Sequence, residues 1–285
     1  YDAMQTMEYQ INSNRVSNGQ TPFVTVGFGL GTDWFAREVQ RAILLNRIRG
    51  LGKDHHTAIF PKLVFTVRHG VNADPGDPNY DLKQLALECA TKRMYPDVVF
   101  YENIVKITGS FKAPMGCRSF LQGWINPETG KDEEDGRMNL GVVSVNVPRI
   151  AIESHGSKER FWKLFNERME VAHQALQFRI MRCKQATPVN APTLFRFGAF
   201  GRLGASGNVD TLFKNERATV SLGYIGLAEA TAVFYGKDWI RDHGWDPQGK
   251  EFALSIVKRM SELCKQWSKA EGYHYSVYST PAESL

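Results

Sequence analysis

Short apolar segments alternate along this chain with longer amphipathic ones, and this alternation constrains the fold more than any other feature of the sequence. The short segments are rich in β-branched residues, as strands are. The longer segments place apolar residues at positions i, i+3, i+4 and i+7, as helices do. Apolar strands connected by helices are typical of a parallel sheet whose two faces are both covered. The sequence therefore predicts an α/β fold with a largely parallel, buried sheet.

The expected elements follow from these patterns. We expect strands or extended segments at 21–29, 61–70, 97–108, 139–152, 217–224 and 273–279, and helices at 33–50, 81–96, 157–183, 226–236 and 249–271. Thr32 or Asp33 is the expected cap of the first helix, and Gly50 its end. The acidic run 131–137 is expected to be a solvated hairpin loop. No internal repeat or linker interrupts the pattern, so residues 1–285 are predicted to form a single domain.

The stretch GFGLGT (27–32) lies where a dinucleotide-binding loop would lie, between a strand and a helix. Its glycines do not follow the GxGxxG spacing, because position 32 is threonine. A tight turn between strand and helix is therefore the favoured interpretation.

Composition excludes several classes of function. The net charge of +5 is not gathered in a Lys/Arg cluster, so it indicates only a general preference for anionic partners. No apolar run approaches the roughly 20 residues that span a bilayer, so we expect no membrane association. The four cysteines are far apart and form no CxxC pair, which argues against a zinc site. Free thiols indicate a reducing, cytoplasmic location.

The two ends of the chain indicate a segment of a longer polypeptide. The chain opens at Tyr1 without an initiator methionine, and it closes on YSTPAESL, where a helix is expected to begin. In that stretch Ser279 and Thr280 precede Pro281, which suits the first turn of a helix. Two interpretations remain open for these hydroxyls: a site for an anion at the helix start, or a plain helix cap.

One of the four cysteines differs from the others in its surroundings. Cys89, Cys183 and Cys264 lie on apolar helical stripes, which indicates small core side chains. Cys117 belongs to no such stripe, and Pro114 and Gly116 predict a turn around it. From spacing alone, Cys117 is either a functional thiol or an incidental loop cysteine.

Six stretches, in order, carry a resemblance to a known family. They are GQTPFVT, GLGKDHHTAIFPKLVF, GDPNYDLKQLALECATKRMYPD, TGSFKAPMGCRSFL, GRMNLGVVSVNVPRIA and SLGYIGLAEA. Together they resemble the central catalytic portion of the anaerobic (class III) ribonucleotide reductases, glycyl-radical enzymes that reduce ribonucleoside triphosphates. The resemblance implies part of the ten-stranded α/β barrel of ribonucleotide reductases and glycyl-radical enzymes, with a finger loop through its centre.

The resemblance also assigns site residues. Cys117 matches the cysteine at the tip of the finger loop, whose thiyl radical takes the 3′ hydrogen of the ribose before the 2′ hydroxyl leaves as water. Asn139 matches an asparagine linked to the use of formate as reductant, although a turn residue before a strand is the simpler alternative. Ser279, Thr280 and Pro281 resemble the loop that binds the phosphates of the substrate.

Several parts of the family's equipment lie outside this chain. The resemblance implies an amino-terminal regulatory domain, a second active-site cysteine, and a carboxy-terminal region with a structural zinc site and the radical glycine. We therefore expect no cofactor in this segment itself. The expected partners are a ribonucleoside triphosphate, formate, a radical-SAM activating enzyme, and the missing carboxy-terminal segment or a second polypeptide that supplies it. The complete enzyme is expected to be a homodimer.

Gly223–Tyr224 looks like the end of the family's radical motif. However, Val220 stands where that motif has arginine. We therefore expect Gly223 to be a turn residue between a strand and a helix, and the chain alone to be inactive.

Two alternatives belong to other functional classes. The first is a cysteine hydrolase that uses Cys117 with a histidine such as His155. The second is a non-catalytic fragment that pairs with another chain.

Overall fold

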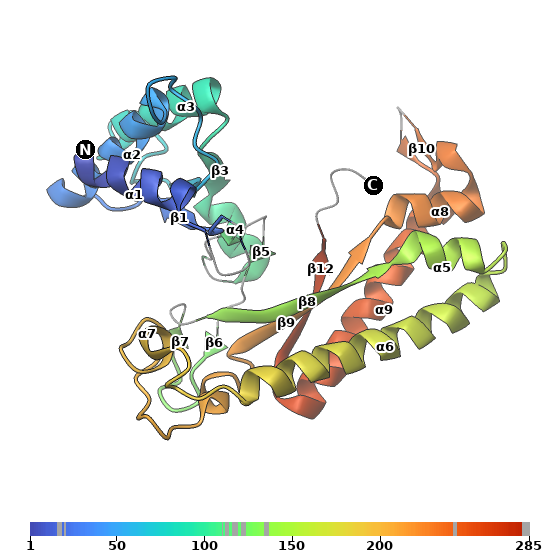
Figure 1. Cartoon of the computed structure of the whole chain (residues 1–285). Helices are drawn as coiled ribbons and strands as arrows, with labels where there is room; N and C mark the ends of the chain where they lie inside the picture. Colours follow the sequence, from blue (N-terminus) through green and yellow to red (C-terminus); the bar gives the residue numbers. More distant parts are fainter. Residues whose placement is uncertain are drawn as a thin grey trace. The chain divides into compact units, whose positions relative to one another are not determined.

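A computed structural model of the chain describes most of its residues in two compact units, divided after residue 122. It describes residues 1–15, 19, 21–109, 111, 114–115, 119–120, 124–133, 137–241 and 244–280. Each unit contains its own three-stranded parallel sheet, which confirms the prediction of parallel α/β structure (Figure 1). Whether residues 1–285 form the predicted single barrel domain stays a prediction.

The first unit alternates helices with the strands of its sheet, whose order is β1-β2-β3. Its elements are α1 (Asp2–Ser13), β1 (Thr25–Phe28), α2 (Trp34–Arg49), β2 (Lys62–Val67), α3 (Tyr80–Arg93), β3 (Asp97–Phe100), α4 (Tyr101–Thr108), and the short strands β4 (Pro114–Met115) and β5 (Ser119–Phe120).

Side-chain amides stabilise the turn between β1 and α2. Buried backbone carbonyl oxygens need hydrogen-bond donors, and in this turn side chains supply them. Asn72 donates from Nδ2 to the carbonyl oxygens of Gly29 and Thr66, both at 2.9 Å. The side chain of Asp33 then caps α2 by accepting a hydrogen bond from the amide of Ala36 at 3.0 Å. GFGLGT is therefore the predicted tight turn between a strand and a helix.

A buried ion pair fastens α1 to α2. Arg47 is fully buried, and its Nε lies 2.5 Å from Glu8 Oε1. Asn46 donates to the second carboxylate oxygen of Glu8, and Arg47 Nη2 donates to the carbonyl of Pro61 at 2.7 Å. A guanidinium without solvent depends on this carboxylate as its counter-charge.

The second unit contains a sheet of order β12-β9-β8 and two long helices. Its elements are β6 (Trp124–Ile125), β7 (Asp132–Glu133), β8 (Met138–Asn146), α5 (Val147–Glu153), α6 (Lys158–Lys184), α7 (Pro192–Phe195), η1 (Val209–Leu212), β9 (Ala218–Ile225), α8 (Leu227–Tyr235), η2 (Lys237–Trp239), β10 (Ile240–Arg241), β11 (Gly244–Trp245), α9 (Pro247–Glu271) and β12 (His274–Ser279).

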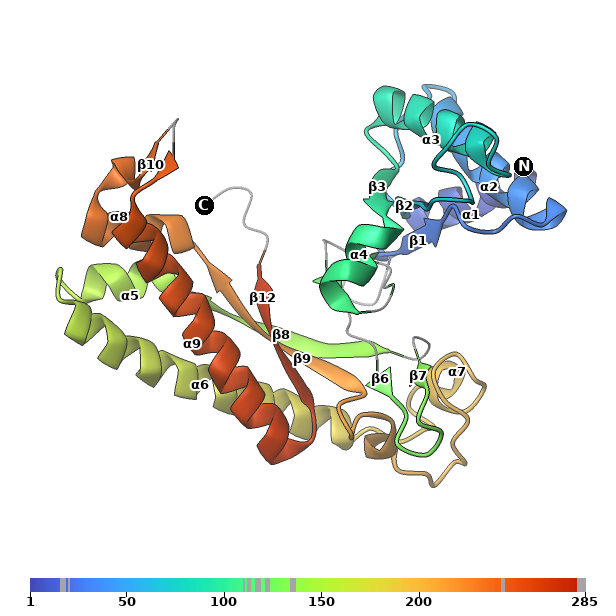
Figure 2. The ribbon, with the colours of Figure 1, turned by 180° about the vertical axis from the view of Figure 1, so that it is seen from behind.

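The two faces of this sheet differ in chemistry. Helices α6 and α9 pack along one face (Figures 1 and 2). Side chains of all three strands meet the helices there in one apolar core, including Val145, Val220, Leu222 and Tyr275. Because side chains alternate along a strand, the residues between them project from the opposite face.

Asp210 connects three parts of the second unit. Its buried carboxylate accepts a hydrogen bond from Tyr273 Oη at 2.7 Å and lies 3.2 Å from Lys214 Nζ and 3.5 Å from Lys184 Nζ. Burial alone would raise the pKa of Asp210, but the hydrogen bonds of Tyr273 and Lys214 and the charge of Lys184 outweigh it and lower the pKa.

Two expected extended segments are only partly extended. The segment 97–108 is strand as far as Phe100 and then becomes α4, which ends at Gly109 in the left-handed conformation. The segment 139–152 is strand as far as Asn146 and then becomes α5, because the Asn146 side chain caps the helix by accepting from the amide of Arg149 and Pro148 suits its first turn. β-branched residues in α4 and α5 concealed both helices.

The other predicted helices and strands agree with the structure within a few residues, whereas α1 was not predicted. The described part of the chain contains no helix long and apolar enough to cross a membrane.

Candidate functional site

The face of the β12-β9-β8 sheet opposite α6 and α9 carries mostly polar side chains, and we call it the polar face. By strand register and alternation, its members are Asn139, Val142 and Ser144 of β8, Thr219, Ser221 and Gly223 of β9, and His274, Ser276 and Tyr278 of β12, continued by Thr280. Two predicted site residues, Asn139 and Thr280, therefore share one face although 141 positions separate them in sequence.

The side-chain amide of Asn139 is fixed at both ends. Its Oδ1 accepts a hydrogen bond from the backbone amide of Gly141 at 2.8 Å, and its Nδ2 donates to Ser221 Oγ at 2.7 Å. A backbone N–H only donates, so the atom facing Gly141 must be the oxygen. Asn139 is half-buried and Ser221 is buried. Asn139 therefore presents N–H, rather than C=O, along the polar face.

A β-bulge in β8 makes this geometry possible. The register between β8 and β9 shifts between Asn139 and Val142, so that Leu140 and Gly141 form the bulge. Gly141 has φ 149°, and a Cβ there would lie 2.6 Å from Cζ of Arg179. Only glycine therefore lets the backbone amide turn back to Asn139 while the Arg179 guanidinium lies against the strand. Asn139 itself is a strand residue rather than the turn residue that the alternative expected.

Farther along the same face, two hydroxyls from different strands meet. Ser144 Oγ and Thr280 Oγ1 are 2.6 Å apart, and the backbone amide of Thr280 donates to the carbonyl of Tyr224 at 3.1 Å. Gly223 lies between them: a Cβ there would be 2.5 Å from Thr280 Oγ1 and closer still to Ser144 Oγ. The two hydroxyls occupy the space that any other side chain at position 223 would need.

The two predicted phosphate-binding hydroxyls are not equivalent. Ser279 ends β12 opposite Tyr224, on the face that α6 and α9 cover, whereas Thr280 follows on the polar face. The structure thus brings Thr280, but not Ser279, onto the face that holds Asn139. Pro281 lies outside the described residues, as does the helix expected to begin there.

The prediction that Gly223 is a turn residue is wrong. Gly223 is buried within β9, and the turn into α8 is made by Gly226, with φ 71°. Gly272 also precedes a tyrosine, but it is the left-handed residue that ends α9. Both glycines have structural reasons for their identity.

Three of the four cysteines lie in apolar surroundings, as the sequence predicts for them. Cys89 and Cys264 are buried on helices, and Cys183 packs against the core of the second unit. Burial raises the pKa of Cys89 to about 11 and that of Cys264 to about 12, so neither is an activated thiol. Cys117 lies outside the described residues. His155, the base of the hydrolase alternative, is an exposed turn residue after α5.

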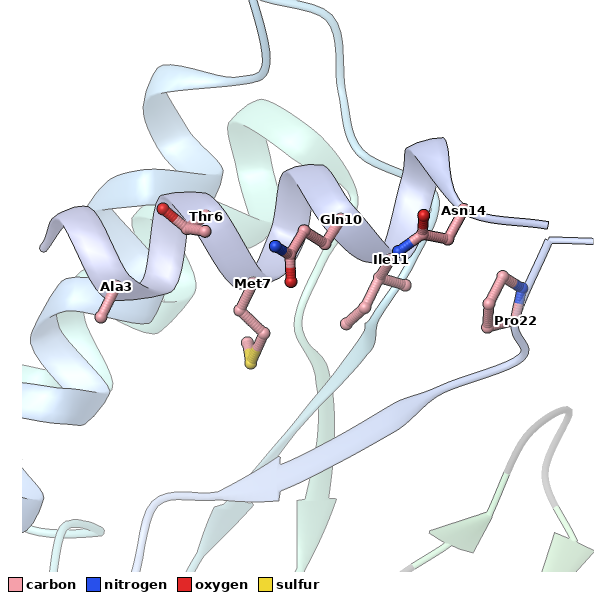
Figure 3. A pocket seen from close by; sticks show the side chains of 7 residues that line it. All are labelled: Ala3, Thr6, Met7, Gln10, Ile11, Asn14 and Pro22. Carbon is pink, nitrogen blue, oxygen red and sulfur yellow. The ribbon is translucent and has the colours of Figure 1, made fainter. Parts of the chain in front are cut away.

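Several surface hollows lie among the described residues of the first unit; one, of about 620 Å³ between α2 and α3, is lined by charged residues that include Arg41, Asp81 and Glu88. Two others are less polar. One of about 510 Å³ is lined by Pro22 and by one side of α1, including Met7, Gln10 and Ile11, and no charged residue faces it (Figure 3). A second, of about 500 Å³, is mainly apolar and adjoins the turn that follows β1. Among the residues described, no three His, Cys, Asp or Glu side chains gather as metal ligands. The hollows of about 510 and 500 Å³ therefore lack the charged and nucleophilic groups of a catalytic centre.

Comparison with known proteins covers the whole chain. The family model described as "Anaerobic ribonucleoside-triphosphate reductase" matches residues 1–285. Curated proteins of that name are 55% identical in Haemophilus influenzae, 52% in Escherichia coli and 49% in the phage T4. All of this chain is covered, but it spans only 40% of the first two relatives and 46% of the third.

Solved structures share the fold at much lower identity. The anaerobic ribonucleotide reductase from Thermotoga maritima in complex with dATP and CTP has a TM-score of 0.62 and 17% identity, covering 99% of this chain and 46% of that one. The same enzyme with citrate in the active site has a TM-score of 0.61. The fold is therefore mixed α/β with parallel sheets, consistent with part of the α/β barrel of these reductases.

Proposed function

The chain belongs to the anaerobic ribonucleoside-triphosphate reductase family, and we propose that it forms the central catalytic part of a longer reductase. The observation that carries this proposal is the match over all 285 residues at about half identity. The proposed reaction converts ribonucleoside triphosphates to 2′-deoxyribonucleoside triphosphates. The hydrolase alternative finds no support among the relatives.

Cys117 is the proposed catalytic thiol. As a thiyl radical, its sulfur takes the hydrogen from C3′ of the ribose, and the 2′ hydroxyl then leaves as water. Formate is the proposed source of the two electrons and is oxidised to CO2, after which the sulfur returns its hydrogen to C3′. The unpaired electron of the thiyl radical comes from a glycyl radical in the part of the reductase outside this chain. The support for this role is the match of TGSFKAPMGCRSFL to the family's finger loop.

Asn139 is proposed to orient formate or the ribose. Its Nδ2 carries two hydrogens, and Ser221 accepts one of them. The second donates to a formate oxygen or to a ribose hydroxyl at the same face. The backbone amide of Gly141 donates to Oδ1, so a flip of the side-chain amide would break this hydrogen bond. Asn139 therefore offers N–H to either ligand. This fixed orientation suits an anionic reductant.

Thr280 is proposed to bind the substrate phosphates, together with the residues that follow it. A hydroxyl donating to a phosphate oxygen makes a charge-assisted hydrogen bond, which contributes about 1.5–3 kcal/mol. Loss of one such bond weakens binding by about 10-fold to 100-fold. Ser279 serves as a matched control, because it precedes Thr280 but belongs to the other face of the sheet.

Nucleotide binding to the longer reductase tests this assignment. Isothermal titration with CTP should show weaker binding for Thr280→Ala by about 10-fold or more and near-unchanged binding for Ser279→Ala. Equal affinity of the wild type and Thr280→Ala would exclude Thr280 from the phosphate site.

The isolated chain provides a second test. After incubation with a radical-SAM activating enzyme and a reductant, it should neither reduce nucleotides nor give a glycyl-radical doublet in electron paramagnetic resonance. A doublet from this chain alone would place the radical glycine within it and contradict the proposal that this glycine lies in another part of the reductase.

A further inference from the structure

We propose that Ser144 is a positioning residue of the phosphate subsite, acting through the hydroxyl of Thr280. This inference rests on the proposed function, since it assumes that Thr280 binds a substrate phosphate. Neither the sequence pattern nor the family resemblance singled out Ser144. What identifies it is a hydroxyl-to-hydroxyl contact of 2.6 Å between residues 136 positions apart.

The contact is built into the sheet rather than formed by chance between mobile side chains. Ser144 lies opposite Gly223 in the β8–β9 register, and Thr280 follows the end of β12 on the other side of β9. The strand between them carries no side chain at that position. A Cβ on Gly223 would fall within 2.5 Å of Thr280 Oγ1, so glycine leaves the space in which the two hydroxyls meet.

The backbone of Thr280 is fixed independently of its side chain. Its amide donates to the carbonyl of Tyr224 at 3.1 Å, which extends the pairing of β12 with β9 by one residue. What remains to be set is χ1, and a threonine side chain has few preferred rotamers. The hydrogen bond with Ser144 favours the one rotamer that directs Oγ1 over Gly223.

The count of hydrogens gives this pair a direction. One hydrogen lies between the two oxygens, and either hydroxyl can be its donor. A phosphate oxygen only accepts, so the hydroxyl that faces the ligand must keep its own hydrogen for the phosphate. The arrangement that satisfies both is Ser144 donating to Thr280 Oγ1 while Thr280 donates to the phosphate. Hydrogen bonds in such a chain also strengthen one another by polarisation.

A double-mutant cycle in the longer reductase tests the proposal. CTP affinity is measured by isothermal titration for the wild type, Ser144→Ala, Thr280→Ala and the double variant. Ser144→Thr retains a hydroxyl at position 144, and Ser206→Ala removes an exposed hydroxyl elsewhere in the second unit as a matched control. Thermal unfolding of each variant separates binding losses from folding losses.

The expected result is that Ser144→Ala weakens binding about 3-fold to 10-fold, as loss of one net hydrogen bond does. The double variant should bind no more weakly than Thr280→Ala alone, because Ser144 acts only through Thr280. Ser144→Thr should recover most of the affinity, and Ser206→Ala should keep all of it.

Three outcomes would overturn the positioning role. If Thr280→Ala weakens binding but Ser144→Ala does not, the phosphate subsite stands and the role of Ser144 fails. If the two single effects add in the double variant, Ser144 acts on the ligand without Thr280. If Thr280→Ala has no effect, the proposed phosphate subsite fails, and the inference fails with it.

Discussion

Replacing Gly223 by alanine should destabilise the second unit, because the added methyl group enters the space of two hydroxyls. Its Cβ would lie 2.5 Å from Thr280 Oγ1, still closer to Ser144 Oγ, and 3.1 Å from Val142 Cγ1. Overpacking of this kind costs about 1–3 kcal/mol, and separating the two hydroxyls forfeits about 1 kcal/mol more. Alanine also lowers the conformational entropy of the unfolded chain, which stabilises the folded state by about 0.4–1 kcal/mol. The net expected loss is therefore about 1–3.5 kcal/mol.

Urea denaturation of the 285-residue chain, followed by circular dichroism, measures this loss. Gly204→Ala is the matched control, since no atom lies within 4 Å of a Cβ at that position and its backbone needs no positive φ. The control should stay within about 0.5 kcal/mol of the wild type. In a Ser144→Ala background, Gly223→Ala should cost less, because one of the two crowded hydroxyls is gone. Equal stability of Gly223→Ala and the wild type would refute the packing argument around these hydroxyls.

Three further predictions concern charges away from the polar face. Glu8→Gln leaves the buried guanidinium of Arg47 without a counter-charge and should cost about 3–5 kcal/mol, measured as lost hydrogen-exchange protection in α1 and α2. Asp210→Asn should destabilise the chain at neutral pH. Because the folded-state pKa of Asp210 is lowered, its stabilisation is present above about pH 4 and is lost as the pH falls through the folded pKa, so urea midpoints of variant and wild type should converge at low pH. His69 should titrate above its ordinary pKa in a nuclear magnetic resonance titration, because it is hydrogen-bonded to Asp74 and attracted by that charge, and Asp74→Asn should lower its pKa.

The layered arrangement could be predicted from the sequence because the relevant signals are local and repeated. Apolar runs marked the long strands, and i, i+3, i+4 spacing marked α6 and α9. The helix caps at Asp33 and Gly50 were visible for the same reason. These patterns predict the fold well, because the apolar faces of the helices and strands are the faces that pack into the core.

Helices α4 and α5 escaped prediction because their composition favours strands. Both α4 and α5 contain several β-branched residues directly after a strand, so the apolar run has no break. The Asn146-Val147-Pro148 sequence was the available signal for α5, because asparagine caps and proline occupies first turns. α4 offered only its final Gly109, a residue type common at helix ends.

The arrangement of the site depends on contacts that no local pattern encodes. Asn139 and Thr280 were identified by family resemblance, but their partners Ser221 and Ser144 were not. The bulge at Gly141 breaks the two-residue period of β8, so alternation counted from Asn139 assigns the wrong face to Ser144. Parallel strands far apart in sequence then bring these side chains together, which requires knowledge of the strand order.

The most direct test of the account is the role of Cys117 in the longer reductase, assayed anaerobically with CTP, formate and the activating enzyme. Electron paramagnetic resonance and product formation are followed in the same sample for the wild type, Cys117→Ser and the core control Cys264→Ala. The account predicts that Cys117→Ser still gives the glycyl-radical doublet but forms no deoxynucleotide, because an alcohol cannot replace the thiol in hydrogen transfer. Cys264→Ala should give both. Deoxynucleotide formation by Cys117→Ser would contradict the central claim.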